Sequence, residues 1–176
     1  LGREVEVLVG GEETRLDRSI AAQIEESLLH LVRNAVDHGI HPPAARRRCG
    51  KPARGTLRIE AATAGDRVRL TIGDDGDGVD RDAVIAKAVA AGLVDAARAD
   101  ALAEEEVHRL LLTPGFSTRA EVSEVSGRGV GLDVVATATA AIGGDLAIAS
   151  QRGVGTTVTV EVPAARRGEV VAVLRV

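Results

Sequence analysis

The 176-residue chain contains almost no aromatic side chains: Phe116 is its only one, and tryptophan, tyrosine and methionine are absent. Its hydrophobic core must therefore consist of leucine, valine, isoleucine and alanine, and hydrophobic residues do make up 45% of the chain. A chain of this length buries enough apolar surface for one domain with a real core. We expect one main domain over residues 1–163 and a short terminal segment after it.

Other absences exclude whole classes of protein. Cys49 is the only cysteine, which excludes an internal disulfide and favours a reducing, cytoplasmic compartment. The N-terminus has charged residues where a signal peptide would be apolar, and the most apolar predicted helix, residues 130–142, is too short to cross a bilayer. A net charge of −4 gives no electrostatic footprint for nucleic acid. The single basic stretch, residues 46–54, lies among prolines and glycines, and we interpret it as a solvated loop.

Alternation and helical spacing predict the order of the elements. Val5, Val7 and Val9 predict a strand, and Gly10-Gly11 after it predicts a hairpin turn. Apolar residues at steps of three and four predict a helix that begins after Asp17 and ends at Gly39. Further helices are expected at 80–91, 95–102, 104–112 and 130–142, strands at 56–63, 67–73, 146–150, 156–162 and 169–176, and a long loop or broken helix at 40–55.

The grouping of these elements predicts the fold class. Strands that form hairpins apart from runs of helices indicate an α+β fold, with helices on one face of a mixed, mostly antiparallel sheet. A doubly wound fold would alternate strand and helix more strictly.

The first long helix carries polar side chains suited to phosphate chemistry. His30, Asn34 and His38 are four residues apart, so a regular helix places them on one face. The Asn34 amide oxygen is a hard, neutral ligand suited to Mg²⁺ beside a polyphosphate. His30 could accept a proton or bond a terminal phosphate. Alternatively the histidines belong to a solvated polar face, or to a zinc site, for which no convincing further ligands are evident.

A glycine-rich turn, Asp74-Asp75-Gly76-Asp77-Gly78, follows a predicted strand directly. At a strand end the Asp74 carboxylate can accept a hydrogen bond from an exocyclic amine, and Gly76 and Gly78 leave room for a purine ring. The alternative is a plain tight turn between strand and helix. A calcium loop is excluded, because Asp80 stands where that loop needs glycine.

A second glycine-rich segment, Ser126-Gly-Arg-Gly-Val-Gly-Leu132, opens a helix and offers bare N–H groups to phosphates. Its spacing fits neither a dinucleotide fingerprint nor a P-loop. Thr156 could hydrogen-bond a base through its hydroxyl, although β propensity alone also explains a threonine there.

Together these motifs resemble the ordered nucleotide-binding boxes of the GHKL superfamily, and most closely the ATP-binding catalytic (HATPase_c) domain of the CheA family of chemotaxis histidine kinases. The matching segments are residues 30–40, 74–78, 114–118, 126–135 and 155–156. The resemblance implies a two-layer α/β sandwich that binds ATP and Mg²⁺ beneath a mobile lid, residues 113–126. Residues 164–176 are expected to form a terminal strand, and the resemblance implies that a following adaptor domain begins there.

The resemblance further implies a role for each matching residue. Asn34 would bind Mg²⁺ and phosphates, Asp74 the adenine amine, and His30 and Asn34 would be the catalytic residues. Other nucleotide-contacting positions would be Arg33, His38, Gly76, Gly78, Lys87, Phe116, Ser117, Thr118, Arg119, Gly127, Arg128, Gly129, Val130, Gly131 and Thr156. The chain departs from the family at His41, Ala83, Arg119 and Leu132, of which Ala83 and Arg119 bear on phosphate binding.

The implied reaction is transfer of the γ-phosphoryl group of ATP to a histidine on a separate phosphotransfer domain, supplied in trans. His30 stands where hydrolysing relatives carry a water-activating glutamate, which counts against an ATPase. The implied partners are dimerisation and adaptor domains, a coupling protein, a chemoreceptor array and, indirectly, a response regulator, with no nucleic acid and no membrane insertion. The alternatives are an ATPase, a serine kinase of the anti-sigma type and a nucleotide-binding regulatory module without kinase activity. The isolated chain is expected to bind ATP but not to phosphorylate itself.

Overall fold

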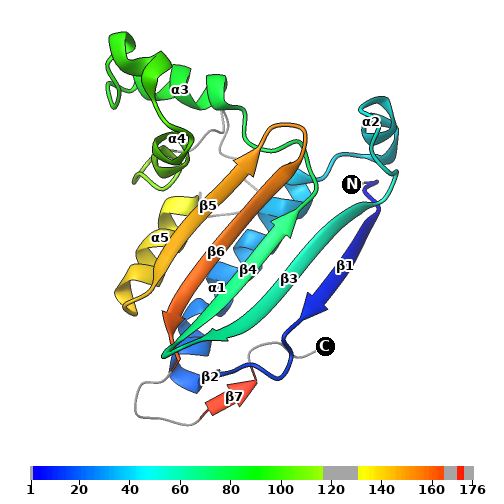
Figure 1. Ribbon diagram of the computed structural model, residues 1–176, viewed down its shortest axis with the longest axis vertical. Coiled ribbons are helices and arrows are strands. Elements are labelled where there is room, and N and C mark those ends of the chain that lie inside the picture. The colour runs from blue at the N-terminus through cyan, green and yellow to red at the C-terminus, as the bar shows by residue number, and fades with distance from the viewer. Residues whose placement is uncertain (1, 117–130, 165–169, 173–176) are drawn as a thin grey trace.

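The structure is a computed structural model that describes residues 2–116, 131–164 and 170–172. Its central sheet has five strands in the order β1-β3-β4-β6-β5 (Figure 1). β1 runs parallel to β3, and every other neighbouring pair in this sheet is antiparallel. The strands are β1 (Val5–Gly10), β3 (Gly55–Ala64), β4 (Arg67–Asp74), β5 (Asp145–Gln151) and β6 (Gly155–Pro163). A separate two-stranded sheet pairs β2 (Arg15–Asp17) with β7 (Val170–Ala172).

The long helices cover one face of the sheet. α1 and α5 lie behind it in Figure 1, α3 and α4 gather beside one end of β5, and the face toward the viewer carries none of the described helices. The helical elements are α1 (Arg18–Asn34), the π-helix η1 (Ala35–Gly39), α2 (Pro43–Arg48), α3 (Arg81–Ala90), the 3₁₀ helix η2 (Ala96–Ala101), α4 (Glu104–Leu110) and α5 (Leu132–Ala141). The predicted α+β class, with a mixed and mostly antiparallel sheet, is confirmed. Among the described residues, no helix combines the length and apolar character needed to cross a bilayer.

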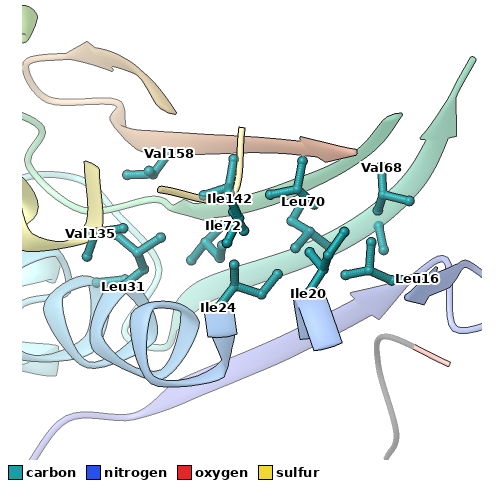
Figure 2. Packing of buried hydrophobic residues seen from close by; sticks show 14 of the residues in the cluster. Leu16, Ile20, Ile24, Leu31, Val68, Leu70, Ile72, Val135, Ile142 and Val158 are labelled. Atoms are coloured by element: carbon teal, nitrogen blue, oxygen red, sulfur yellow. The ribbon is translucent and has the colours of Figure 1, made fainter. Parts of the chain in front are cut away.

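The main core lies between the helices and the sheet, and it is aliphatic as predicted. Ile20, Ile24 and Leu31 of α1 face Leu70 and Ile72 of β4 (Figure 2). A second cluster beneath α3 and α4 contains the single aromatic ring; its buried members are Val84, Ile85, Ala88, Val107, Leu111 and Phe116. The two clusters meet near Leu132 and Ile148, which pack against both, and this junction borders the site described below.

Two predicted helix starts are confirmed by their side-chain caps. The Asp17 carboxylate accepts hydrogen bonds from the backbone N–H and the hydroxyl of Ser19, at 2.8 and 2.6 Å. The Asp80 carboxylate accepts one from the Ala83 N–H at 3.1 Å. Each cap satisfies a donor that the first turn of a helix leaves without an intrahelical partner.

The chain departs from the prediction at the end of the first helix. α1 ends at Asn34 and continues as the π-helix η1, which the Ile40 N–H closes onto the Ala35 carbonyl at 2.9 Å. Single π turns of this kind occur frequently at functional sites. Here the turn carries His38 and Gly39, both of which border the cavity described below.

The predicted hairpin at Gly10-Gly11 is wrong. β1 pairs in parallel with β3, which follows only after β2, α1, η1 and α2, and β2 pairs with β7 instead. Gly11 has φ 78°, and a Cβ there would overlap the Ala61 carbonyl, so the glycine allows the chain to pass tightly under β3. The segment predicted as a long loop or broken helix contains the short helix α2. The helix expected from residue 130 begins at Leu132 with Gly131 as its N-cap.

Candidate functional site

A cavity of about 440 Å³ opens where β4 ends and β6 begins. Its walls are mainly apolar with a few convergent polar groups, which is the usual character of a small-molecule site. The apolar walls are Leu31, Ala35, Ile72, Val79, Val84, Leu111, Phe116, Leu132 and Val158, and the polar side chains are Asn34, His38, Asp74, Asp80 and Thr156. A larger depression of about 700 Å³ lies on the face of the sheet that carries none of the described helices. None of the predicted site residues that lie on helices lines it.

The cavity brings together predicted residues that are far apart in the sequence. Seven of them line it: Asn34, His38, Asp74, Gly78, Phe116, Gly131 and Thr156. They come from the α1–η1 junction, the end of β4 and the loop after it, the segment after α4, the start of α5 and the start of β6. Ala83 and Leu132, two departures from the family pattern, line it as well.

Asp74 is the half-buried carboxylate of the cavity. Burial raises the pKa of Asp74 above its ordinary value, and the charge of Asp75 adds to this, whereas backbone hydrogen bonds at Gly76 and Thr156 and the charge of Lys51 act in the opposite direction. The Gly76 N–H donates to Asp74 Oδ1 at 2.8 Å. A carboxylate held in an apolar cavity with its charge incompletely compensated is suited to accept a hydrogen bond from a ligand amine.

Three backbone segments meet around Asp74, two of them at its carboxylate and one at its carbonyl, and glycine makes their approach feasible. A Cβ on Gly39 would lie 2.6 Å from Asp74 Cγ, and a Cβ on Gly76 would overlap the Gly39 carbonyl. Gly155 has φ 148°, and its Cβ would overlap the Asp74 carbonyl. Packing therefore supplies a reason for Gly76 that is independent of any ligand, and its predicted contact with the base stays a prediction.

Asn34 and His30 form a hydrogen-bonded pair, which confirms that they share a helix face. Asn34 Nδ2 lies 2.8 Å from His30 Nε2, and because the amide nitrogen can only donate, Nε2 accepts. Within the described part of the chain, the Asn34 oxygen accepts no hydrogen bond. Asn34 lines the cavity and His30 does not, so His30 contacts the cavity through Asn34. Its predicted catalytic role stays a prediction.

Thr156 is held by a residue that the sequence reasoning missed. Ser150 Oγ lies 2.9 Å from the Thr156 hydroxyl and 3.1 Å from the Gly155 carbonyl, and it accepts a hydrogen bond from the Val79 N–H at 2.8 Å. It therefore links β5, β6 and the loop after β4. Thr156 is also the β6 partner of Asp74 in the sheet register.

Besides Gly76, two predicted nucleotide contacts lie outside the cavity lining. The Lys87 ammonium lies 5.9 Å from the centre of the Phe116 ring, in a cation–π arrangement, and it is the ring that faces the cavity. Arg33 is exposed on α1. Neither position is tested as a nucleotide contact, and both stay predictions.

The N-terminal end of α5 reaches the cavity through Gly131 and Leu132. Among the described residues no side chain caps this end, so the N–H groups of Leu132 and Asp133 and the helix dipole can face an anion, whereas the Val134 N–H donates to the Gly131 carbonyl at 3.2 Å. The remaining predicted lid and phosphate-loop residues, Ser117, Thr118, Arg119, Gly127, Arg128, Gly129 and Val130, lie outside the described residues. Among the residues that are described, no group of three His, Cys, Asp or Glu side chains is placed to hold a metal ion.

The interpretation of residues 46–54 as a solvated basic loop is wrong for two of its cations. The Arg46 side chain is buried, donates to the Pro52 carbonyl at 2.7 Å and pairs with Asp75 Oδ2 at 2.7 Å. Lys51 Nζ donates to the carbonyls of Asp75 and Gly76 at 2.7 and 2.6 Å. Both cations therefore hold the loop that follows Asp74. A run of cations in the sequence does not show which members are buried, because their partners lie far along the chain.

Comparison with known proteins places these features in a family. Residues 20–166 match the family model for histidine kinase-, DNA gyrase B- and HSP90-like ATPases. The chain is 44% identical over 161 residues to the chemotaxis protein CheA of Cereibacter sphaeroides and 41% identical over 163 residues to the sensor histidine kinase CheAY of Helicobacter pylori. It is 40% identical over 162 residues to the gliding motility regulatory protein of Myxococcus xanthus. These alignments cover 92–93% of this chain but only 20–23% of the relatives' lengths.

Solved structures share the fold at lower sequence identity. The catalytic domain of histidine kinase ThkA, in a nucleotide-free form, superposes with a TM-score of 0.56 at 17% identity, covering 91% of this chain and 79% of that one. Full-length ShkA in complex with AMPPNP gives a TM-score of 0.51 at 23% identity, covering 99% of this chain and 27% of that one. The family match spans both the cavity and the elements that build it, and the chain thus belongs to the family of histidine kinase-, DNA gyrase B- and HSP90-like ATPases.

Proposed function

We propose that this chain is the ATP-binding catalytic domain of a CheA-type chemotaxis histidine kinase. The observation that carries the proposal is the convergence of Asn34, Asp74 and the N-terminal end of α5 on one cavity. The Asp74 carboxylate would accept the exocyclic amine of adenine, and the apolar walls would enclose the ring. The helix N-terminus would face the phosphates.

The donor set at Asn34 fits Mg²⁺ bound together with a nucleotide. The His30 contact engages the amide nitrogen and leaves the oxygen for a hard cation. A Mg²⁺ ion usually keeps several waters and takes phosphate oxygens as ligands, so one protein oxygen is an adequate contribution. When bound, the ion would neutralise charge on the polyphosphate, while this chain's residues position the nucleotide.

The phosphoryl acceptor would be a histidine on a separate phosphotransfer domain. Relatives that bear the names CheA and sensor histidine kinase CheAY support this choice over hydrolysis. The imidazole nitrogen would attack the γ-phosphorus as the bond to the β-phosphate oxygen breaks, releasing ADP. Dimerisation and adaptor domains, a coupling protein, a chemoreceptor array and a response regulator would be partners of the whole protein, in the cytoplasm.

Labelled ATP tests the kinase proposal. The chain and a separately produced histidine phosphotransfer domain from such a kinase are mixed with Mg²⁺ and γ-labelled ATP. We expect label on the phosphotransfer domain and none on the chain alone. Release of labelled phosphate without labelled protein would show a hydrolase and overturn the proposal.

Replacing Asn34 by alanine is expected to remove the contribution of Mg²⁺ to nucleotide binding. By calorimetry, the Mg²⁺-dependent gain in ADP affinity should fall by about tenfold, equivalent to about 1.4 kcal/mol, whereas affinity without Mg²⁺ should change little. Gln23→Ala is the matched control, because Gln23 is an exposed amide on the same helix and, among the described residues, its side chain bonds only the Ser19 carbonyl. An equal loss with and without Mg²⁺ would remove Asn34 from the metal site.

A further inference from the structure

The peptide group between Asp75 and Gly76 is hydrogen-bonded on both sides. Its carbonyl oxygen accepts from Lys51 Nζ at 2.7 Å and from Arg46 Nη1 at 3.2 Å. Its N–H donates to Asp74 Oδ1 at 2.8 Å. Because a trans peptide is planar, its C=O and N–H point in opposite directions, and holding the oxygen also sets the direction of the N–H. Two cations therefore lie on one side of this group and the cavity carboxylate lies on the other.

Within the described part of the chain, the Lys51 ammonium donates hydrogen bonds to backbone carbonyls only. Besides the Asp75 carbonyl, its ammonium donates to the carbonyl of Gly76 at 2.6 Å and to that of Val154 at 3.5 Å. The first two belong to the loop after β4, and Val154 belongs to the turn between β5 and β6. Lys51 thus joins the two segments that present Asp74 and Thr156 to the cavity.

Arg46 and Lys51 differ in how their charges are compensated. Arg46 is 2% exposed, and Asp75 Oδ2 lies 2.7 Å from its guanidinium, so that charge is paired. Lys51 is half-buried and forms no ion pair among the described residues, so its charge also acts on Asp74. The other charged or titratable groups near Asp74 are Asp75, His38 and Asp80, and beyond them the pair formed by His41 and Asp77 at 3.0 Å.

We propose that Lys51 is a positioning residue for base recognition, acting on Asp74 through the peptide group that joins Asp75 to Gly76. A cation on the carbonyl polarises that peptide and strengthens its N–H as a donor, which holds the Asp74 carboxylate in the orientation that receives the adenine amine. This inference rests on the nucleotide site proposed above. Lys51 itself does not line the cavity, so its effect on a ligand is indirect.

The test pairs a change in the protein with a change in the ligand. ADP and purine ribonucleoside 5′-diphosphate, which lacks the 6-amino group, are titrated calorimetrically into wild type, Lys51→Met, Lys51→Gln and Lys51→Arg. Wild type should prefer ADP. Lys51→Met should weaken ADP binding by roughly tenfold and binding of the analogue much less, so the preference shrinks. Lys51→Arg, which keeps the charge, should restore part of the preference for ADP. Lys51→Gln replaces Lys51→Met in this test if the methionine variant fails to fold.

A pH series separates positioning from simple structural support. Loss of the Lys51 charge removes an influence that lowers the pKa of Asp74, so ADP binding by Lys51→Met should weaken at a higher pH than in wild type as the solution is acidified. Arg48→Met, an exposed cation of the same segment, should leave both readouts unchanged.

Equal weakening of both ligands, with an unchanged pH profile, would overturn the inference and leave Lys51 as structural support. Absence of ADP binding by wild type would instead refute the nucleotide site itself. The two failures are therefore distinguishable.

Discussion

Asparagine in place of Asp74 is expected to weaken ADP binding by about 100-fold, or about 3 kcal/mol, while the domain stays folded. The Gly76 N–H donates to Asp74 Oδ1, and in the variant it would hold the amide oxygen at the same place. The amide NH₂ would then take the other position, where it meets the adenine amine donor to donor. Calorimetric titration with ADP measures the loss, and Asp66→Asn, an exposed acid in the β3–β4 turn, is the control.

The same substitution should change how stability depends on pH. Because burial raises the pKa of Asp74 in the folded protein, the folded state binds more protons than the unfolded state between the ordinary and the raised pKa. Wild-type stability therefore contains a contribution from this group that falls as pH rises through that window. Asp74→Asn lacks this contribution. The variant should therefore be at least as stable as wild type at neutral pH, and its stability should vary less with pH at acidic pH.

Urea unfolding followed by circular dichroism, from acidic to neutral pH, checks this expectation. Circular dichroism suits a chain that has no tryptophan or tyrosine. A variant less stable than wild type at neutral pH would show that Asp74 supports the fold rather than serving a ligand.

Arg46→Met is expected to cause the largest loss of stability, about 3 kcal/mol in the free energy of unfolding. The guanidinium is buried and bonds the Pro52, Arg54 and Asp75 carbonyls as well as the Asp75 carboxylate. Methionine fills part of the volume but removes all of these hydrogen bonds, although the Asp75 carbonyl keeps the one from Lys51. In the variant, the Asp75 carboxylate still accepts a hydrogen bond from the Thr56 N–H at 2.9 Å, and its side chain is 36% exposed. Because Asp75 is therefore not left wholly uncompensated, we expect a loss of stability at the low end of the range for broken buried ion pairs.

Arg47→Met is the matched control, because Arg47 is the exposed neighbour on α2. It should change the unfolding free energy by less than about 0.5 kcal/mol. Equal urea midpoints for the two variants would contradict the role assigned to Arg46.

Local features of the structure follow from local features of the sequence. Alternation at Val68, Leu70 and Ile72 predicted β4, and the spacing of Ile20, Ile24 and Leu31 predicted α1 and the face that it buries. Asp17 and Asp80 predicted two helix starts, because a cap needs only residues within three positions of it. The convergence of Asn34, Asp74 and Thr156 followed from the family resemblance, since periodicity alone does not bring distant segments together.

The sequence by itself therefore determined the class of fold and the aliphatic core, and with the family resemblance it named seven of the residues that line the cavity. Only the tertiary structure decided that β1 pairs with β3, that the first helix ends in a π turn, and that Arg46, Lys51 and Ser150 support the site. The physical reason is separation along the chain: Arg46 meets Asp75 across 29 positions, and Lys51 meets Val154 across 103. Secondary-structure propensity depends on residues that are near in the sequence, whereas contacts between residues this far apart form only once the sheet has assembled.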